Sequence, residues 1–293
     1  MHQPHQPISC YVCPLCAASL QLNQKSYVCK NNHHFDLAKE GYLNLLPVQH
    51  KRSGEPGDSK QMMQARREFL EAGYYEPMAQ AVAMMVNANQ PKHLLDLGCG
   101  EGYYSRMIEA HCPNTMMLHG VDIAKFAIAA AAKKQPNARF IVASANRLPY
   151  ADQYFDFVLR VFAPSNEHEL KRILKPSGFL LTVTPGPRHL WQLKKFIYAD
   201  VQEHTLESEL PQGFERIDRQ RISYKIVPNL QQRIALLQMT PFAWRANESV
   251  QQAIKDVAEL EIETDFILTL AIKTPYKPSN AGALQDANSI LKS

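Results

Sequence analysis

The pattern of apolar and polar positions divides the chain into a short N-terminal part, a connecting part and a long region of regular alternation. Residues 1–47 contain only short apolar pieces of strand length. Residues 48–91 open on a polar stretch broken by glycine and proline, which predicts a loop, and continue with helical periodicity. Residues 92–273 alternate between apolar runs and amphipathic segments. Residues 274–293 are small, polar and interrupted by proline, which predicts a disordered tail.

Two helices are expected in the connecting part. The first runs through Met62 and Phe69, and the second covers about Pro77–Val86. Either Asp58 or Ser59 can cap the first helix, because both side chains accept hydrogen bonds from free backbone amides. These helices lead directly into the long region.

The long region predicts an α/β fold. The expected strands are His93–Leu97, Met116–Val121, Arg139–Ala143, Phe155–Val161 and Phe179–Thr184, with two more near Ile222–Val227 and Glu263–Lys273. The expected helices are Tyr104–Ala110, Ala124–Lys134, Glu167–Leu174 and Leu190–Val201. Continuous apolar strands that alternate with helices are typical of a mostly parallel sheet covered on both faces.

Composition narrows the class of protein. With 293 residues, 45% of them hydrophobic, the chain can bury a large core. The formal net charge of +4 is compatible with a polyanionic partner but does not identify one. No apolar run approaches the roughly 18–20 residues that cross a bilayer, and residues 1–9 lack the apolar centre of a signal peptide. Because four of the six cysteines cluster near the N-terminus, we expect a metal site in a reducing cytoplasm rather than disulfides.

A strand that runs into three glycines predicts a ligand-binding turn. Asp96, Gly98, Gly100 and Gly102 form the pattern acid-x-Gly-x-Gly-x-Gly. Glycines let the backbone turn tightly and approach a ligand at the carboxyl end of a strand. A dinucleotide-binding turn would place its last glycine where Tyr103 stands, and it has no special use for an acid inside the strand.

The pattern instead resembles the first motif of the class I S-adenosylmethionine-dependent methyltransferases, which have a Rossmann-like fold. The resemblance implies that Asp96 helps to bind the methionine amino group and that the glycine backbone lies against the methionyl and ribose parts. Asp122 ends the second strand and is placed to accept hydrogen bonds from the ribose hydroxyls. The loop that contains Asn146 would border the adenine, and Leu174–Leu181 resembles the turn and fifth strand of the class. The alternative is a tight turn without a cofactor.

The N-terminal cysteines predict a zinc site, and we assign residues 1–47 to a zinc-binding module. Its expected ligands are Cys13, Cys16, Cys29 and His33. Cys-x2-Cys and Cys-x3-His pairs separated by twelve residues supply four tetrahedral ligands, which leaves no open position and indicates a structural site. His34 competes with His33 for the fourth position, and Cys10 is a spare candidate with no spacing in its favour.

Basic residues near this cluster and on the first helix are candidates for phosphate contacts, although surface lysines are usually only solvated. They are Lys25, Lys30, Lys39, Lys51, Arg52, Arg66 and Arg67.

Longer motifs resemble the RlmA (RrmA) family of 23S rRNA guanine-N1 methyltransferases over about residues 10–273. These motifs are His34–Pro47, His50–Ser53, Pro56–Ser59, Met62–Arg67, Gly98–Tyr104, Thr184–Leu190 and Leu237–Arg245. The resemblance implies methylation of guanine N1 in a hairpin loop of 23S rRNA by a homodimer whose zinc modules help to form an RNA-binding cleft. By position it also implicates Tyr75, the Gly100–Glu101 turn and His189 in binding S-adenosylmethionine.

The chemistry requires removal of the N1 proton, and Asp58 and Glu167 are the candidate bases. After the fourth strand, Phe162 could stack on the base or belong to the core, while Arg160 could polarise guanine O6 or form an ion pair. Two other functions remain open at this point. One is a small-molecule methyltransferase with a structural zinc knuckle, and the other is a non-enzymatic RNA-binding or assembly factor.

Overall fold

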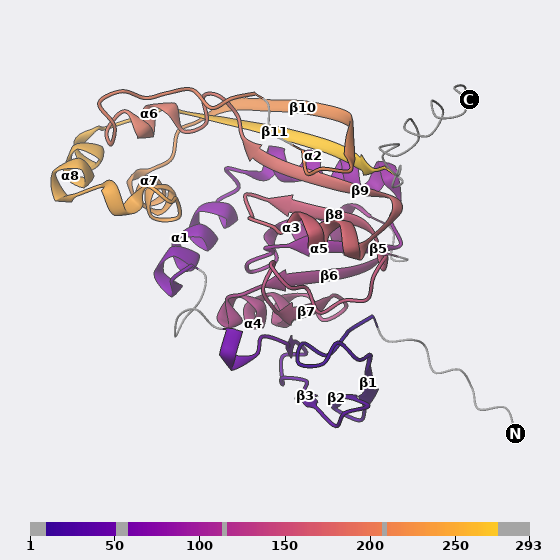
Figure 1. Ribbon diagram of the computed structural model, residues 1–293. Helices are drawn as coiled ribbons and strands as arrows, with labels where there is room; N and C mark the ends of the chain where they lie inside the picture. The colour runs from indigo at the N-terminus through magenta and orange to yellow at the C-terminus, as the bar shows by residue number, and fades with distance from the viewer. Residues whose placement is uncertain (1–9, 51–57, 113–115, 207–209, 275–293) are drawn as a thin grey trace, which may run out of the picture.

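The structure is a computed structural model that describes residues 10–50, 58–112, 116–206 and 210–274 (Figure 1). The expected C-terminal tail from residue 275 onward, the N-terminal nine residues and the candidate phosphate contacts Lys51 and Arg52 lie outside the described residues. In the described part, no helix is long and apolar enough to cross a membrane.

The N-terminal part forms a small antiparallel sheet in the order β1-β2-β3. Its strands are β1 (Leu20–Asn23), β2 (Ser26–Cys29) and β3 (His34–Asp36). The next strand, β4 (Leu43–Asn44), leaves this sheet and pairs in parallel with β7 (Arg139–Val142). The residue range 1–47 that we assigned to the zinc module therefore also supplies an edge strand of the main sheet.

The main sheet has eight strands in the order β10-β11-β9-β8-β5-β6-β7-β4. Besides β4 and β7 it contains β5 (His93–Leu97), β6 (Met117–Asp122), β8 (Phe155–Val161), β9 (Leu174–Pro185), β10 (Phe214–Ile226) and β11 (Ile262–Lys273). Strands β4 to β9 pair in parallel, and β11 runs antiparallel to both β9 and β10. This is the mostly parallel sheet expected from the sequence.

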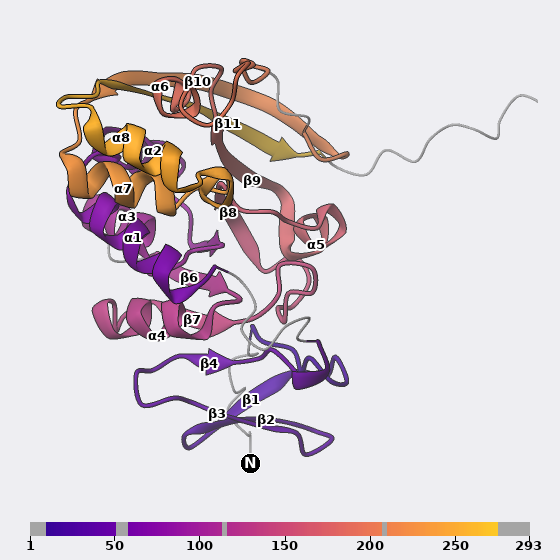
Figure 2. The same ribbon diagram turned by 90° about the vertical axis from the view of Figure 1, so that its left-hand side faces the viewer.

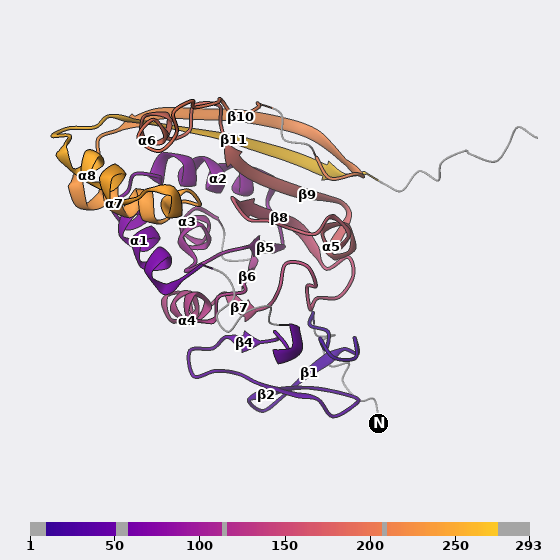
Figure 3. The ribbon, with the colours of Figure 1, turned by 60° about the vertical axis from the view of Figure 1, so that its left-hand side comes forward.

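Ten helical segments accompany the sheet in the described residues. They are η1 (Val48–His50), α1 (Lys60–Glu71), α2 (Glu76–Asn89), α3 (Tyr103–His111), α4 (Lys125–Lys134), α5 (Glu167–Ile173), α6 (Trp191–Lys194), α7 (Leu230–Gln238), η2 (Ala243–Arg245) and α8 (Glu248–Asp256). Helices α1 to α4 lie on one side of the sheet and α5 on the other (Figures 2 and 3). Ser59, rather than Asp58, caps α1 by accepting a hydrogen bond from the Met62 amide.

In the C-terminal third, one expected helix was wrong and two helices were missed. The helix expected over Leu190–Val201 is the single turn α6, because the following amides, such as that of Phe196, bond three residues back and continue it only as turns. Helices α7 and α8 were not expected, although their caps are visible in the sequence. Asn229 and Gln232 form a capping box at α7, and Asn247 caps α8.

The two faces of the sheet have separate hydrophobic cores. On the face of α2 and α3, the strands pack against residues such as Val82. On the opposite face, the core combines α5 with the N-terminal part, since Tyr11 and Leu20 are buried in the same cluster as Phe155. The N-terminal part therefore takes the place that a further covering helix would occupy.

Candidate functional site

A cavity of about 1290 Å³ opens at the carboxyl edge of the parallel strands. The loops that follow β5, β6, β7, β8 and β9 all contribute to its wall, as do α1 and the segment between α6 and α8. Along the sheet the chain runs outward in both directions from β5 and β8, so the cavity lies at the topological switch point where open α/β sheets bind ligands.

The glycine turn after β5 forms one wall of this cavity. Gly98, Gly100 and Gly102 all have left-handed backbone angles, with φ of 79°, 54° and 74°. The amides of Gly98 and Cys99 donate to the Val121 carbonyl at 2.8 and 3.0 Å, which holds the turn against β6. A Cβ atom on Gly102 would lie 2.3 Å from Gln135 Nε2, so this glycine serves packing behind the wall and does not line the cavity.

The two predicted acids occupy different depths. Asp96 is buried behind the cavity wall, where its Oδ2 accepts a 2.6 Å hydrogen bond from Ser105 Oγ, and burial raises its pKa to about 7. Asp122 lines the cavity itself. Its Oδ2 accepts from the Gly100 amide at 2.9 Å and its Oδ1 from the Ala124 amide at 2.8 Å. Each oxygen retains a further lone pair for a ligand hydroxyl.

Tyr75 and His189 meet in the wall, although 114 residues separate them in the chain. Both side chains are buried, and Tyr75 Oη lies 3.4 Å from His189 Nε2. His189 Nδ1 accepts from the Asp265 amide at 3.2 Å, which leaves the ring proton on Nε2. Burial lowers the pKa of His189 to about 3, so the ring is neutral.

The remaining predicted cofactor residues also line the cavity. The carboxylate of Glu101 forms a two-bond ion pair with Arg67 of α1, one of whose bonds joins Arg67 Nε to Oε2 at 2.6 Å. This pair fixes α1 to the glycine turn. Asn146 is exposed at the rim, where its amide donates to Ser144 Oγ at 3.2 Å.

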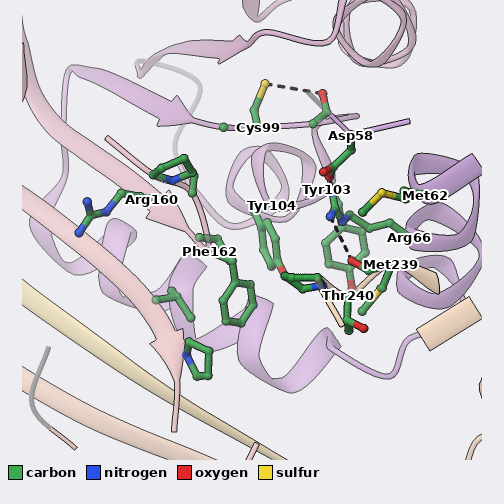
Figure 4. A pocket seen from close by; sticks show the side chains of 18 of the residues that line it. Asp58, Met62, Arg66, Cys99, Tyr103, Tyr104, Arg160, Phe162, Met239 and Thr240 are labelled. Atoms are coloured by element: carbon green, nitrogen blue, oxygen red, sulfur yellow. Dashed lines mark hydrogen bonds and ion pairs between the residues drawn. The ribbon is translucent and has the colours of Figure 1, made fainter. Parts of the chain in front are cut away.

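Of the two candidate general bases for removal of the guanine N1 proton, only one lies at the cavity. Asp58 lines the cavity but is ion-paired with Arg66 at 2.6 Å, and Arg66 also donates to the Met239 carbonyl (Figure 4). Glu167 does not line the cavity. Arg160 forms no ion pair within the described residues; it donates to Ser165 Oγ and, at 3.3 Å, to Thr182 Oγ1.

Phe162 combines an unusual backbone conformation with an exposed aromatic ring. It directly follows β8, its φ is +53°, and its side chain is 44% exposed. Bulky residues rarely adopt a left-handed backbone, and such conformations cluster at ligand sites. Its ring centroid lies 5.8 Å from that of His189, and the ring extends into the space between the strand ends and Tyr104 (Figure 4). Phe162 therefore belongs to the cavity and not to the core.

The sequence did not single out several other residues of the wall. They are Lys194, Tyr198 and His204. Lys194 and His204 form a hydrogen-bonded pair at 2.7 Å, and burial lowers the pKa of both groups. No motif marks these three residues, because only the return of the chain after β9 brings them to the cavity.

The N-terminal cluster has the geometry of a tetrahedral metal site. Its ligand atoms, from Cys13, Cys16, Cys29 and His33, all lie within 4.8 Å of one another. His33 Nδ1 lies 3.4 Å from the sulfurs of Cys13 and Cys29. The sulfurs of Cys16 and Cys29 are 3.7 Å apart. Zinc–ligand bonds of usual length predict tetrahedron edges of about 3.6 Å for sulfur to nitrogen and about 3.8 Å for sulfur to sulfur.

The two alternative ligands lie outside this cluster. His34 is exposed and pairs with Asn32 Oδ1 at 3.0 Å. Cys10 is buried on the core side, and its Sγ is 4.0 Å from an Arg139 nitrogen. The donor set of three thiolates and one imidazole thus fits zinc without either of them.

Comparison with known proteins places these features in one family. Residues 11–54 match the model of the RlmA N-terminal zinc ribbon, and residues 94–178 match a methyltransferase domain. YxjB of Bacillus subtilis (strain 168), which carries the provisional name 23S rRNA (guanine-N(1)-)-methyltransferase, is 30% identical over 283 residues, covering 90% of this chain and 98% of that protein. The 23S rRNA (guanine(748)-N(1))-methyltransferase of Streptomyces fradiae is 31% identical, covering 85% of this chain and 90% of that protein.

A relative with a different substrate matches less of the chain. The malonyl-[acyl-carrier protein] O-methyltransferase of Halorhodospira halophila (strain DSM 244 / SL1) is 30% identical over only 36% of this chain and 38% of its own length. The relatives that match nearly end to end are the rRNA enzymes. This chain belongs to the family of the 23S rRNA (guanine-N1)-methyltransferases.

Proposed function

We propose that this protein transfers the methyl group of S-adenosylmethionine to N1 of a guanine in a hairpin loop of 23S rRNA. The observation that carries the proposal is the near-complete match to rRNA guanine-N1 methyltransferases, together with the match of residues 11–54 to the RlmA zinc ribbon. S-adenosylmethionine and zinc are its cofactors. Action on rRNA implies that the enzyme is cytoplasmic. The family resemblance implies that it is a homodimer, and sedimentation velocity would test this oligomeric state.

S-adenosylmethionine would be held by the wall of the glycine turn. Asp122 can accept hydrogen bonds from the ribose hydroxyls, because its two oxygens are already oriented by the amides of Gly100 and Ala124. The left-handed backbone at Gly98 and Gly100 leaves room for the methionyl part to approach the main chain. Asn146 lines the cavity at the rim, where it would border the adenine.

The other predicted cofactor residues support this wall. Tyr75 and His189 close the inner end as a neutral, hydrogen-bonded pair. Glu101 contributes its main chain to the glycine turn, and its carboxylate is ion-paired with Arg67. Asp96 and Gly102 act from behind the wall, where a cationic ligand amino group nearby would favour the charged form of Asp96.

Bound S-adenosylmethionine supplies an electrophilic methyl group, and the protein must align guanine N1 with it and exclude water. A guanine inside the hairpin stack cannot reach the cavity, so the base has to be drawn out. Phe162 is positioned to receive it, because its ring projects into the cavity from the loop that faces the glycine turn. The left-handed backbone at this residue, with φ of +53°, is of the kind that clusters at ligand sites.

Replacing Phe162 with alanine is therefore expected to raise the KM for RNA and lower kcat together, by about tenfold in kcat/KM, because stacking on one base contributes roughly 1–3 kcal/mol. Phe162→Tyr keeps the ring and should retain most activity. Calorimetric binding of S-adenosylmethionine should be nearly unchanged in both variants. Equal losses in the alanine and tyrosine variants would contradict a stacking role.

The proposal as a whole is tested by mapping 1-methylguanosine in 23S rRNA by mass spectrometry, with and without the gene. We expect one hairpin-loop 1-methylguanosine to disappear and to be restored by the wild-type gene but not by Gly98→Arg. Unchanged rRNA would refute the rRNA substrate, and because residues 94–178 match a methyltransferase domain, the small-molecule methyltransferase would then be the favoured hypothesis.

A further inference from the structure

An exposed tryptophan follows closely in the chain on residues that line the cavity. Trp244, in η2 between α7 and α8, is 77% exposed, which is unusual for so large an apolar side chain. The residues just before it, Thr240 to Phe242, line the cavity wall. Trp244 therefore marks a surface that begins where the cavity ends.

Aromatic and guanidinium groups connect Trp244 to the cavity in one continuous row. The Arg245 guanidinium lies 4.7 Å from the Trp244 ring centroid and 5.3 Å from that of Tyr198. Tyr198 in turn meets Phe242 edge to face, with ring centroids 6.4 Å apart. Because Tyr198 and Phe242 both line the cavity, the row runs from the wall outward to solvent.

The charge of this row is available to a ligand. Arg245 has no carboxylate partner within the described residues, and its side chain is exposed. The second tryptophan provides an internal comparison. Arg188 also lies 4.7 Å from the Trp191 ring, but Glu263 and Glu203 neutralise it, and Trp191 is only partly exposed. The Trp191 pair is structural, whereas the Trp244 pair presents a free cation beside an open aromatic face.

We propose that Trp244 and Arg245 bind the nucleotide next to the methylated guanine, Trp244 by stacking on its base and Arg245 by contacting its phosphate. The inference rests on the proposed function, since it takes RNA as the substrate. A guanine that leaves its stack to enter the cavity also exposes the face of its neighbour, and an aromatic ring at the mouth replaces the lost stacking. The guanidinium supplies the phosphate contact that positions the strand.

Steady-state kinetics on a 23S rRNA transcript tests the role of each side chain. Trp244→Ala is expected to raise the KM for RNA about tenfold while kcat and the affinity for S-adenosylmethionine change little. Trp244→Phe should keep most of the RNA affinity. Arg245→Gln should weaken RNA binding and reduce the salt dependence of the binding constant by nearly one phosphate contact. The matched control is Met84→Ala, which removes an exposed apolar side chain on a different element, α2. It should behave as wild type.

Fluorescence gives a readout that does not depend on activity, because the chain has only two tryptophans. Trp191→Phe leaves Trp244 as the single fluorophore, and a hairpin that contains the methylated guanine should quench it. Trp244→Phe leaves Trp191, which the same hairpin should hardly affect. Quenching confined to the first protein supports the stacking contact.

Four outcomes would overturn the inference. An unchanged KM for RNA in Trp244→Ala, or an unchanged Trp244 emission on addition of the hairpin, removes the nucleotide contact while the methyltransferase activity of the wild-type protein stands. A Trp244→Ala protein that changes from dimer to monomer assigns this surface to a second copy of the chain instead. A wild-type protein that methylates no guanine of the transcript refutes the proposed function, and the inference with it.

Discussion

Replacing Gly98 with alanine is expected to weaken S-adenosylmethionine binding at least about tenfold and to remove most methyl transfer. The added Cβ would lie 2.4 Å from the Cβ of Ala163, and the backbone φ of +79° costs an L-residue roughly 1–2 kcal/mol. Either the glycine turn or the loop after β8 must move to relieve the overlap. Both border the cavity, so titration calorimetry with S-adenosylmethionine and quantification of 1-methylguanosine should show the loss together.

Two further variants separate the overlap from the backbone strain. Gly41 also has a left-handed backbone, with φ of +89°, but a Cβ there would meet no atom within 4 Å. Gly41→Ala should therefore introduce the backbone strain without an atomic overlap, and its affinity for S-adenosylmethionine should be unchanged. The double variant Gly98→Ala/Ala163→Gly removes the overlapping carbon and should recover part of the binding. If the double variant is no better than Gly98→Ala, the overlap is not the cause.

Replacing His33 with alanine is expected to release zinc and to lower the melting temperature of the whole protein, not only of its N-terminal part. Structural zinc contributes roughly 10–16 kcal/mol of apparent binding free energy in zinc-finger peptides, and small modules depend on it to fold. The N-terminal part also completes the main sheet. Tyr11 and Leu20 are buried in the core of one face, and β4 forms the edge beside β7. Metal analysis by mass spectrometry and differential scanning calorimetry would measure both effects.

His34→Ala is the matched control for this variant. His34 is the adjacent histidine, but it is exposed and bonded to Asn32, so its loss should leave zinc and the melting temperature unchanged. Zinc retained by His33→Ala and lost from His34→Ala would reverse the ligand assignment. Complete loss of zinc with an unaltered melting transition would show that the N-terminal part does not stabilise the main sheet.

Local patterns in the sequence were sufficient for the catalytic sheet and for the metal cluster. The strand Phe155–Val161 was predicted with the bounds that the structure gives, because it is a mostly apolar run of strand length between turn residues. The spacing of Cys13, Cys16, Cys29 and His33 implied a shared ion, and the structure brings their ligand atoms together. In both cases the information lies within a few neighbouring residues, where period and spacing reflect backbone geometry directly.

Contacts between distant segments had no such local signal, and only the tertiary structure decided them. The pairing of β4 with β7, the position of Tyr75 against His189 and the row that ends at Trp244 each join residues far apart in the chain. The periodicity of apolar residues cannot predict these contacts, because they depend on the path that the chain takes between one strand and the next. The sequence by itself thus determined the fold class, the glycine turn and the zinc ligands, while tertiary packing decided the cavity wall and made the zinc module part of the catalytic core.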